Sequence, residues 1–427
     1  MRVVICTLYF PPCTFTPANR IFSWAKYLPQ LGIYPIIITR QWKTTAVIDE
    51  FYLEKTVDEA VYIEKHEGYE VHFLPFKGNY RTRSLTQPKN IFKKIAVKIF
   101  TAAEFIFRYW FPAILPYGNL FTYAFNYAKN NKVDKLLISG KPFMLFKIGY
   151  RISKKLNIPW VADYRDGWTT DNYPEAIGPL TKPVHVLNRY FEKKWMATAA
   201  SFITVSNHIK KGIQNYTGVN GEVVYNGFYA ENNAAPALVK NNSSITFLYS
   251  GVLYNGQDYQ TVVTVFKKII DQYKGQIDVK LLFLGTSFAN PAFANNPVFE
   301  GYGNNIIMLE RVNYLEALKI HQQADAFIML THQGKKGIVS SKIFDYIKFN
   351  KPVVLFDNDF DVLEEIVTNS GLGIIAGNAQ QLQTKLDSLV KEKLATGFID
   401  IKPNTAYINS FSRENQTKKL AGLLKEQ

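Results

Sequence analysis

Short apolar runs that can form buried strands recur along the whole chain, and helix-like patterns separate them. The first run, Val3–Tyr9, is apolar on both faces, which is typical of a central parallel strand covered by helices. After it, Thr16 is predicted to cap a helix that has Pro17 at its first position. Gly32 ends that helix, and Tyr34–Thr39 forms the next strand. A strand–helix–strand unit of this kind favours a parallel sheet with right-handed crossovers.

The other predicted strands fall into two series separated by a polar segment, Glu231–Ser244, which we interpret as a linker. The first series continues with Val71–Pro75, Lys135–Ser139, Trp160–Ala162, Phe202–Val205 and Val223–Val224. The second consists of Ile245–Ser250, Val279–Leu284, Ile306–Met308, Ala326–Leu330, Pro352–Phe356 and Gly373–Ile375. A chain of 427 residues is too long for one ordinary core. The sequence therefore predicts an α/β fold of two doubly wound, Rossmann-like domains, 1–228 and 229–408, with a final helix, 409–427, returning to the first.

The charge of the chain is concentrated in its first half. Residues 1–200 hold 28 Lys and Arg against 15 Asp and Glu, a net charge of +13, whereas residues 201–427 hold 22 against 20, a net charge of +2. A nucleic acid or an anionic membrane surface is the natural partner of such a domain. No uncharged apolar run of about 18 residues occurs, so a membrane-spanning helix is not expected.

The two cysteines, Cys6 and Cys13, both lie near the N-terminus. Met1 and Arg2 lead directly into a strand-like run instead of a longer apolar segment with a cleavage site, so no secretory signal is predicted. A reducing, cytoplasmic setting is therefore expected, in which both cysteines are inert small apolar residues.

The segment Gly337–Val354 reads as a polar loop, an amphipathic helix and a buried strand. The loop offers the hydroxyls of Ser340 and Ser341 at a helix start, with Lys342 and Asp345 in the first turns. A helix start of this kind favours an anion such as a phosphate, and a carboxylate suits a nearby neutral diol. We interpret the segment as a nucleotide-sugar site.

Other loops that follow predicted strands would face the same ligand, because ligands of doubly wound sheets sit beyond the carboxyl ends of the strands. Gly251 opens a polar loop after Ile245–Ser250 and allows close approach of the backbone. Arg311 and Val312 follow another strand, where backbone groups can read a base edge. Each of these loops also fits an ordinary strand–helix turn.

Three charged residues follow a buried strand of the first domain: Asp163, Arg165 and Asp166. Charges at such a place are costly unless they are paired or used. One interpretation is an ion pair between Arg165 and a carboxylate that holds the loop. The other is that Asp163 or Asp166 contacts a sugar or an acceptor hydroxyl, with Arg165 on a phosphate.

Taken together, these motifs resemble family 4 glycosyltransferases of the GT-B architecture, of the bacterial cell-envelope polysaccharide type. The most specific matches are Ser341–Tyr346 and Lys351–Val354, supported by the WVADYRDGW, FLYSGVL, YFPP, NGF and FSRE sequences. The resemblance implies a retaining transferase that binds a nucleotide diphosphate sugar, usually a UDP-sugar, in the C-terminal domain. It implies no metal cofactor, and the sequence offers no His/Asp cluster with metal-ligand spacing. Acceptor contacts are expected from Arg165, Thr14 and Arg20.

Two departures from the family pattern bear on the site. The family commonly has two acidic residues eight positions apart, of which only the second, Asp345, is present, with Gly337 at the first position. The Arg and Lys that often clamp the diphosphate are also missing, with Asn255 and Gln257 in that stretch. Lys342 is then the best remaining cation for the departing diphosphate, and it is predicted to act in catalysis together with Asp163 or Asp166.

The segment Ile91–Trp110 is patterned as a basic amphipathic helix. The predicted contacts with an anionic membrane are Lys93, Lys94, Lys98, Arg108 and Trp110. The alternative is a core helix of the first domain with a solvated basic stripe.

The sequence thus predicts a glycosyltransferase that acts on a saccharide or lipid-linked saccharide at the inner face of the cell membrane, in polysaccharide biosynthesis such as that of lipopolysaccharide or capsule. Two alternatives stay open: a non-catalytic subunit that binds a sugar nucleotide or a membrane, and another GT-B enzyme such as an epimerase. A nucleic-acid protein is less favoured, because no recognisable recognition module accompanies the basic residues.

Overall fold

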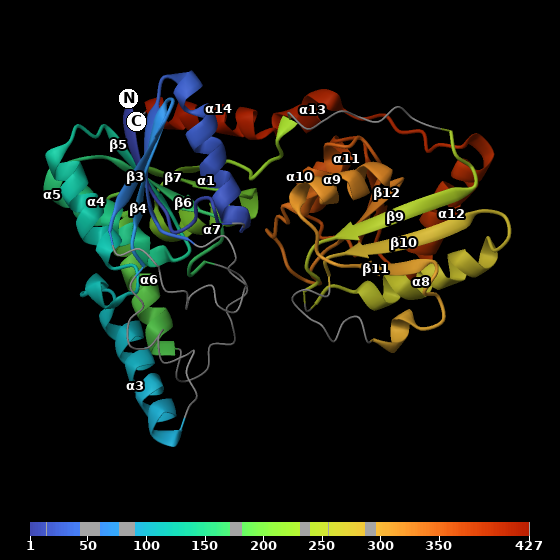
Figure 1. Ribbon diagram of the computed structural model, residues 1–427, viewed down its shortest axis with the longest axis horizontal. Coiled ribbons are helices and arrows are strands. Elements are labelled where there is room, and N and C mark those ends of the chain that lie inside the picture. The colour runs from blue at the N-terminus through green and yellow to red at the C-terminus, as the bar shows by residue number, and fades with distance from the viewer. Residues whose placement is uncertain are drawn as a thin grey trace. The chain divides into compact units, whose positions relative to one another are not determined.

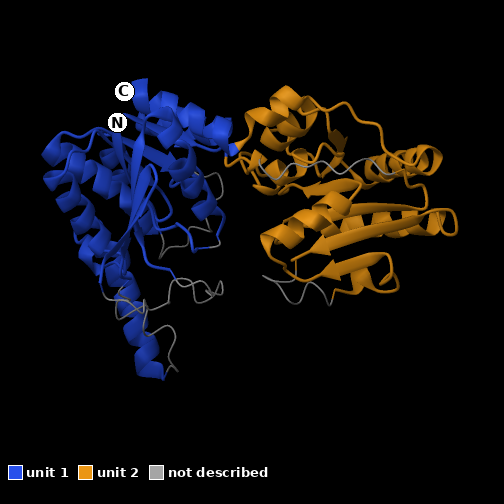
Figure 2. Ribbon diagram, turned by 45° about the horizontal axis from the view of Figure 1, so that its top comes forward, with its two compact units in different colours: residues 1–225, 413–427 blue, residues 226–412 orange. Residues whose placement is uncertain are grey.

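The computed structural model describes residues 1–13, 15–42, 60–76, 90–170, 182–230, 240–254, 256–286 and 296–426. It divides the chain into two compact units (Figures 1 and 2). Unit 1 consists of Met1–Tyr225 and Arg413–Gln427, and unit 2 of Asn226–Ser412. The chain therefore leaves unit 1 once, builds unit 2 and returns.

Unit 1 is built on an eight-stranded sheet in the order β3-β4-β2-β1-β5-β6-β7-β8. Its strands are β1 Arg2–Cys6, β2 Tyr34–Arg40, β3 Tyr62–His66, β4 Tyr69–Leu74, β5 Lys135–Ser139, β6 Trp160–Tyr164, β7 Ser201–Thr204 and β8 Gly221–Val223. All neighbouring strands pair in parallel except β3 and β4. Its helices are α1 Thr16–Tyr27, α3 Ile91–Phe107, α4 Asn119–Asn130, α5 Phe146–Leu156, α6 Lys182–Met196, α7 Asn207–Thr217 and α14 Arg413–Glu426.

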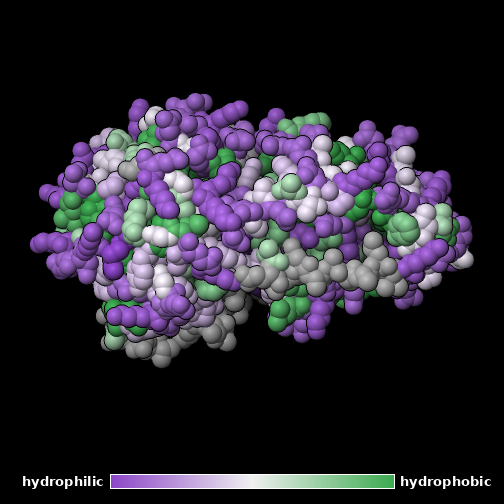
Figure 3. Space-filling view, turned by 90° about the horizontal axis from the view of Figure 1, so that it is seen from above, coloured by the Kyte–Doolittle hydropathy of each residue, from purple (hydrophilic) through white to green (hydrophobic). Residues whose placement is uncertain are grey.

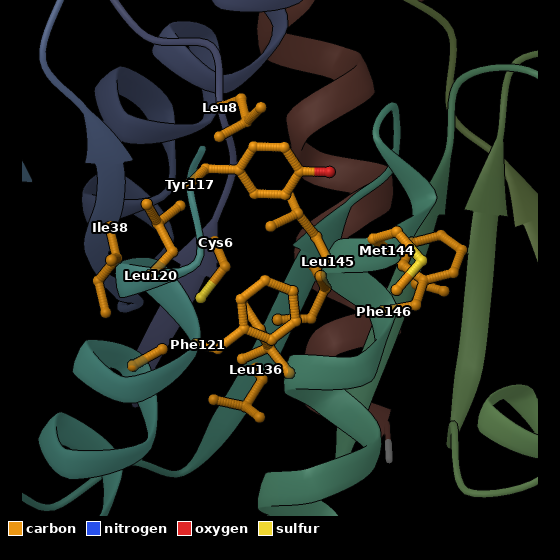
Figure 4. Packing of buried hydrophobic residues seen from close by; sticks show 14 of the residues in the cluster. Cys6, Leu8, Ile38, Tyr117, Leu120, Phe121, Leu136, Met144, Leu145 and Phe146 are labelled. Atoms are coloured by element: carbon orange, nitrogen blue, oxygen red, sulfur yellow. The ribbon is translucent and has the colours of Figure 1, made fainter. Parts of the chain in front are cut away.

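Each face of this sheet is covered by its own apolar cluster, because successive residues of a strand point to opposite faces. Cys6 and Leu136 pack on one face with Phe121 of α4 and Phe146 of α5 (Figure 4). On the other face, α1 and α14 cover the sheet with residues that include Trp24 and Leu424. The α14 helix is fixed there in part by the Lys135 ammonium, which donates to the Leu424 carbonyl at 2.7 Å.

Unit 2 has a six-stranded, fully parallel sheet in the order β11-β10-β9-β12-β13-β14. Its strands are β9 Ser244–Ser250, β10 Asp278–Leu284, β11 Ile306–Leu309, β12 Ala326–Leu330, β13 Val353–Phe356 and β14 Gly373–Ala376. Its helices are α8 Tyr259–Gln272, α9 Tyr314–Gln323, α10 Lys342–Ile347, α11 Val362–Asn369, α12 Ala379–Thr396 and α13 Thr405–Ser410. The predicted fold class, two doubly wound α/β domains, is confirmed.

Some local predictions were wrong. The helix α1 ends at Tyr27 and not at Gly32, which instead ends the short 3-10 helix Pro29–Leu31. Phe15, not Thr16, precedes the first helix, and no side chain caps its first turn. The antiparallel edge strand β3 escaped prediction because all five of its residues are exposed and it has no apolar face to reveal it. Cys6 and Cys13 are both buried, and burial raises the pKa of the Cys6 thiol to about 12.

Candidate functional site

Lys342, the first residue of α10, reaches the loop that follows β9 in the same unit. Its ammonium donates to the Tyr249 hydroxyl at 2.6 Å and to the Val252 carbonyl at 2.8 Å. It also lies 4.2 Å from the centre of the Tyr249 ring. Two neutral oxygens and an aromatic face therefore hold this cation at the carboxyl edge of the sheet.

Gly251 makes room for the lysine. Its φ of +87° is a conformation that side chains rarely adopt, and a Cβ there would lie 2.8 Å from Lys342 Cε. The loop that carries this glycine therefore passes directly over the lysine side chain.

The Lys342 ammonium has no acidic partner among the residues that the structure describes: it forms no ion pair with any of their Asp or Glu side chains. No described carboxylate compensates for its removal from water, and burial lowers the pKa of the Lys342 amine to about 7. An anion that bound against it would restore the charged form, because an opposite charge nearby favours protonation.

Asp345 lies one turn further along α10, with 41% of its side chain exposed. One of its oxygens is 3.8 Å from the Lys348 ammonium, whose side chain is fully buried. Ser340 and Ser341 are half-buried, and neither hydroxyl forms a hydrogen bond with another described residue. These groups thus keep hydrogen-bonding capacity for a ligand, as the sequence-based assignment requires.

The loops after β9, β10 and β11 lie side by side. The Gly251 amide donates to the Leu284 carbonyl at 2.7 Å, and the Gly285 amide donates to the Leu309 carbonyl at 2.8 Å. A Cβ on Gly285 would lie 3.5 Å from Arg311 Cα. Arg311 is exposed and Val312 half-buried. The structure therefore brings Gly251 and Arg311 to one edge of unit 2, two loops apart.

An acidic residue that the sequence did not single out reaches the loop before α10. The Gly337 amide donates to Asp361 Oδ2 at 2.5 Å, and Asp361 lies at the start of α11. Asp359 holds that start, because its carboxylate accepts from the amides of Leu363 and Glu364. Position 337, where an acid is expected from the resemblance and the chain has a glycine, is thus buried and bonded to the Asp361 carboxylate.

A second cluster that the sequence did not reveal fixes the end of β9. The Ser250 hydroxyl lies 3.0 Å from His321 Nε2, and the Ser250 amide donates to the Tyr346 hydroxyl at 2.9 Å. His321 Nδ1 lies 2.5 Å from the Ala317 carbonyl, so it carries the proton and Nε2 accepts. His321 and Tyr346 have ordinary core patterns in the sequence, and only their packing shows that they orient the residue before Gly251.

In unit 1, Asp163 is fully buried and bonded within the protein. Its carboxylate accepts from Arg20 at 3.0 Å and from the Ser139 hydroxyl at 2.8 Å. Arg20 is 1% exposed and also donates to the Val224 carbonyl at 2.8 Å. This geometry argues against the predicted catalytic contact of Asp163 and the predicted acceptor contact of Arg20, because the two side chains form an ion pair with each other inside the protein.

Asp166 and Arg165 lie at the surface of the same edge. Asp166 pairs with Lys141 at 2.9 Å, and both side chains are about half exposed. Arg165 donates to the carbonyls of Gly140 and Lys141 and lies 5.0 Å from the Tyr9 ring. The first of the two interpretations, an Arg165–carboxylate pair, is not found among the described residues, and Asp166 pairs instead with Lys141, a residue that the sequence did not indicate. Thr14 lies outside the described residues.

Among the described residues, no group of three or more His, Cys, Asp or Glu side chains is placed to hold a metal ion. Independence from metal stays a prediction.

Part of the chain is similar in sequence to a known protein family. Residues 231–404, all within unit 2, match the model of a family described as glycosyl transferases group 1. No curated protein sequence gives a significant match.

Solved structures resemble the chain over its whole length. Sucrose-phosphate synthase from Thermosynechococcus elongatus has a TM-score of 0.66 at 12% identity, covering 100% of this chain and 98% of that chain. Anabaena HepE, solved with UDP and glucose, has a TM-score of 0.60 at 14% identity, with both chains fully covered. UDP-GlcNAc 2-epimerase from Methanocaldococcus jannaschii has a TM-score of 0.52 at 13% identity, again over both full chains. Identities this low establish the fold, which is of the GT-B type with two Rossmann-like units.

Proposed function

We propose that the protein is a glycosyltransferase that binds a UDP-sugar in unit 2 and transfers the sugar to a saccharide acceptor held by unit 1. The observation that carries the proposal is the Lys342 ammonium, which is withdrawn from water at the carboxyl edge of the unit 2 sheet without an acidic partner among the described residues. The group 1 match of residues 231–404 and the UDP in the HepE structure support the choice of ligand.

In this proposal Lys342 acts on the diphosphate that leaves the sugar. Negative charge grows on the leaving group as the glycosidic bond to the nucleotide breaks, and a cation already fixed beside it lowers the barrier. Tyr249 and the Val252 carbonyl hold the ammonium in place, so little reorganisation is needed during the reaction. Burial makes the Lys342 amine easy to deprotonate, and the negative charge of the bound ligand favours its protonated form.

The remaining contacts follow the arrangement of the loops. Asp345 is proposed to accept from the ribose hydroxyls, and the backbone at Arg311 and Val312 to read the base edge. Gly251 would let the backbone approach the phosphates closely, and the hydroxyls of Ser340 and Ser341 would donate to them. In unit 1, Asp166, held by Lys141, is the exposed carboxylate proposed to meet the acceptor. Asp163 then has a positioning role, because it fixes the strand end through Arg20 and Ser139.

Retention at the anomeric carbon and a cell-envelope polysaccharide product are the finer parts of the proposal. Both rest on the resemblance of Ser341–Tyr346 and Lys351–Val354 to family 4 enzymes. Proton NMR of the first product formed from an α-linked UDP-sugar tests retention, since an α-linked product is expected and a β-linked one contradicts it.

The test of the main proposal is UDP release from a panel of UDP-sugars with purified protein, with and without acceptor. Lys342→Ala is expected to lower turnover about 10²–10³-fold, the usual effect of removing one fixed donor to a developing negative charge. Lys268→Ala, on the exposed side of α8, is the matched control and should keep full activity. Normal turnover of the Lys342 variant would reject the role given to this lysine.

Two alternatives keep the same donor site. The epimerase among the structural neighbours shows that this fold also serves an enzyme named for epimerising a UDP-sugar. The glycine at position 337, in place of an acid, favours a subunit that binds without catalysis. Product analysis separates the three: transfer or hydrolysis supports the proposal, a C2-epimerised UDP-sugar supports the epimerase, and tight UDP binding without turnover supports the binder.

A further inference from the structure

Helix α3 turns its apolar face away from the body of unit 1. Of its 17 residues, only Val97 and Glu104 are buried. The large apolar residues are exposed instead, with 78% exposure for Phe92, 68% for Ile91 and 63% for Ile99. Figure 1 shows the helix extending from the unit instead of lying across its sheet. The alternative interpretation, a core helix with a solvated basic stripe, is therefore wrong.

The arrangement of residues around α3 is that of an interfacial helix. At about 100° per residue, the exposed apolar side chains occupy roughly one half of the helix circumference, opposite Val97 and Glu104. Lys93 borders this half on one side, and Lys94 and Lys98 border it on the other. All three lysines are exposed. An apolar face flanked by cations matches the boundary between lipid acyl chains and anionic headgroups.

The apolar surface continues from α3 onto α6. Trp110 and Phe111, which follow α3, are 51% and 64% exposed, and Tyr190 of α6 is 58% exposed. The two segments are joined, because the Tyr109 hydroxyl donates to Asn188 at 2.6 Å and the Tyr109 ring stacks on Phe191. Exposed tryptophan and tyrosine are typical of the headgroup level of a membrane.

Arg108 has a different place from the one that the sequence suggested. It is half-buried and donates to the Tyr109 hydroxyl at 3.0 Å and to Asn188 at 3.3 Å. It therefore joins α3 to α6 and positions the surface, while the lysines on α3 are left to meet lipid headgroups.

A continuous apolar surface of this kind is unusual for a protein surface. Figure 3 shows another face of the molecule, where hydrophobic residues form small patches among hydrophilic ones. No described helix is long and apolar enough to cross a bilayer. The excess of 13 positive charges in residues 1–200 favours an anionic partner.

We propose that α3 lies in the headgroup layer of an anionic bilayer with Phe92, Ile95 and Ile99 inserted, and that Trp110, Phe111 and Tyr190 sit at its edge. Attachment depends first on these apolar side chains and second on Lys93, Lys94 and Lys98. This inference rests on the proposed function in one respect: it names the acceptor as an amphiphile, a saccharide linked to a lipid of the same bilayer.

The test is co-flotation of the full-length protein with vesicles of phosphatidylcholine, alone or mixed with phosphatidylglycerol. The wild type should bind the mixed vesicles. Phe92→Ser/Ile99→Ser should weaken binding at least tenfold at low and high salt, because two inserted side chains are lost. Lys93→Gln/Lys94→Gln/Lys98→Gln should weaken binding to the mixed vesicles about fivefold for each lysine at low salt and much less at high salt.

Lys268→Gln, in unit 2, is the control for loss of one positive charge that is not part of this surface, and it should bind as the wild type does. Circular dichroism and UDP binding show that each variant is folded, and UDP binding also separates failure of this inference from failure of the proposed function. Two results would overturn the inference: a wild type that ignores both kinds of vesicle, or a dimer in solution that Phe92→Ser converts to a monomer.

Discussion

Unit 1 and unit 2 each hold a cation away from water near the carboxyl edge of a parallel sheet, but they treat it differently. Arg20 in unit 1 is paired with the buried carboxylate of Asp163 at 3.0 Å. Among the described residues, Lys342 in unit 2 donates only to the hydroxyl of Tyr249 and the carbonyl of Val252. The charge of Arg20 is neutralised by a carboxylate of the protein, whereas the charge of Lys342 can be neutralised by a bound anion.

The difference shows which buried charge supports the fold and which can serve a ligand. A buried ion pair tolerates loss of one partner poorly, since the other charge then remains in a medium of low polarity. A lysine without an acid can shed its proton, so its burial costs less when no ligand is bound. Charged residues at a sheet edge are therefore functional candidates when their charge is uncompensated, and structural ones when it is paired.

Arg20→Met gives the sharpest test of this comparison. The change leaves Asp163 buried and unpaired, so it should destabilise unit 1 by about 3–5 kcal/mol. All six tryptophans lie in residues 1–200, so denaturant unfolding followed by tryptophan fluorescence reports on unit 1. A loss of less than about 1 kcal/mol would show that this pair does not stabilise the fold.

Lys342→Met is the matched variant in unit 2. It removes a cation that is paired with no acid among the described residues, so the free energy of unfolding without ligand should stay within about 1 kcal/mol of the wild type or rise. Far-ultraviolet circular dichroism follows this transition, with UDP protection as the second readout. A loss as large as that of Arg20→Met would mean that Lys342 is structural.

Glu192→Gln tests a buried acid that forms no ion pair with any residue that the structure describes. The Glu192 carboxylate accepts from Tyr164 at 3.0 Å and from Thr169, and burial raises the pKa of this carboxyl group to about 7. Because the folded state binds its proton more tightly than the unfolded state, this group's contribution to stability falls as the pH rises from about 4.5 to 7. The variant should thus resemble the wild type near pH 4.5 and be more stable by about 1–3 kcal/mol at pH 8. An equal difference at both pH values would contradict this cause.

The affinity for UDP should fall as the pH rises above 7. Only the protonated Lys342 amine attracts the diphosphate, and its pKa of about 7 in the free protein means that the protonated fraction falls through this range. The dissociation constant should increase by up to about tenfold for each pH unit between 7.5 and 9, with proton uptake on binding, both measurable by calorimetry. Lys342→Arg keeps its charge at every pH and should flatten the profile. A flat wild-type profile would place the diphosphate elsewhere.

The sequence predicted the strands well wherever a run was apolar on both faces. Parallel strands covered by helices have this signature, so β5 and β12 were predicted to the residue and most others to within two. The same reasoning could not find β3, whose residues are all exposed and whose partner is antiparallel. For α3, the amphipathic pattern identified the basic residues, but it could not decide whether the apolar side faces the core or the solvent.

Within the site, the loop chemistry of Ser340, Ser341, Lys342 and Asp345 could be predicted because these residues are close in the chain. Tyr249, His321 and Asp361 could not, because a tyrosine at a strand end and a histidine in a helix look like ordinary packing. Their roles depend on contacts across 70 residues or more in two cases, Lys342 with Tyr249 and His321 with Ser250. The sequence gives one weak sign of these contacts: a Ser-Gly pair after an apolar strand indicates that another side chain can approach the backbone closely there.

Apolar periodicity alone determined that this chain forms two doubly wound α/β units, because the burial of each strand face is a property of neighbouring residues. Only the tertiary structure decided which charged side chains are paired within the protein and which can meet a ligand. Asp163 and Arg20 are 143 residues apart, so their pairing leaves no trace in the local pattern. It also decided that the apolar side of α3 is left open. Local sequence sets which surfaces a segment can bury, and packing sets which of them it does.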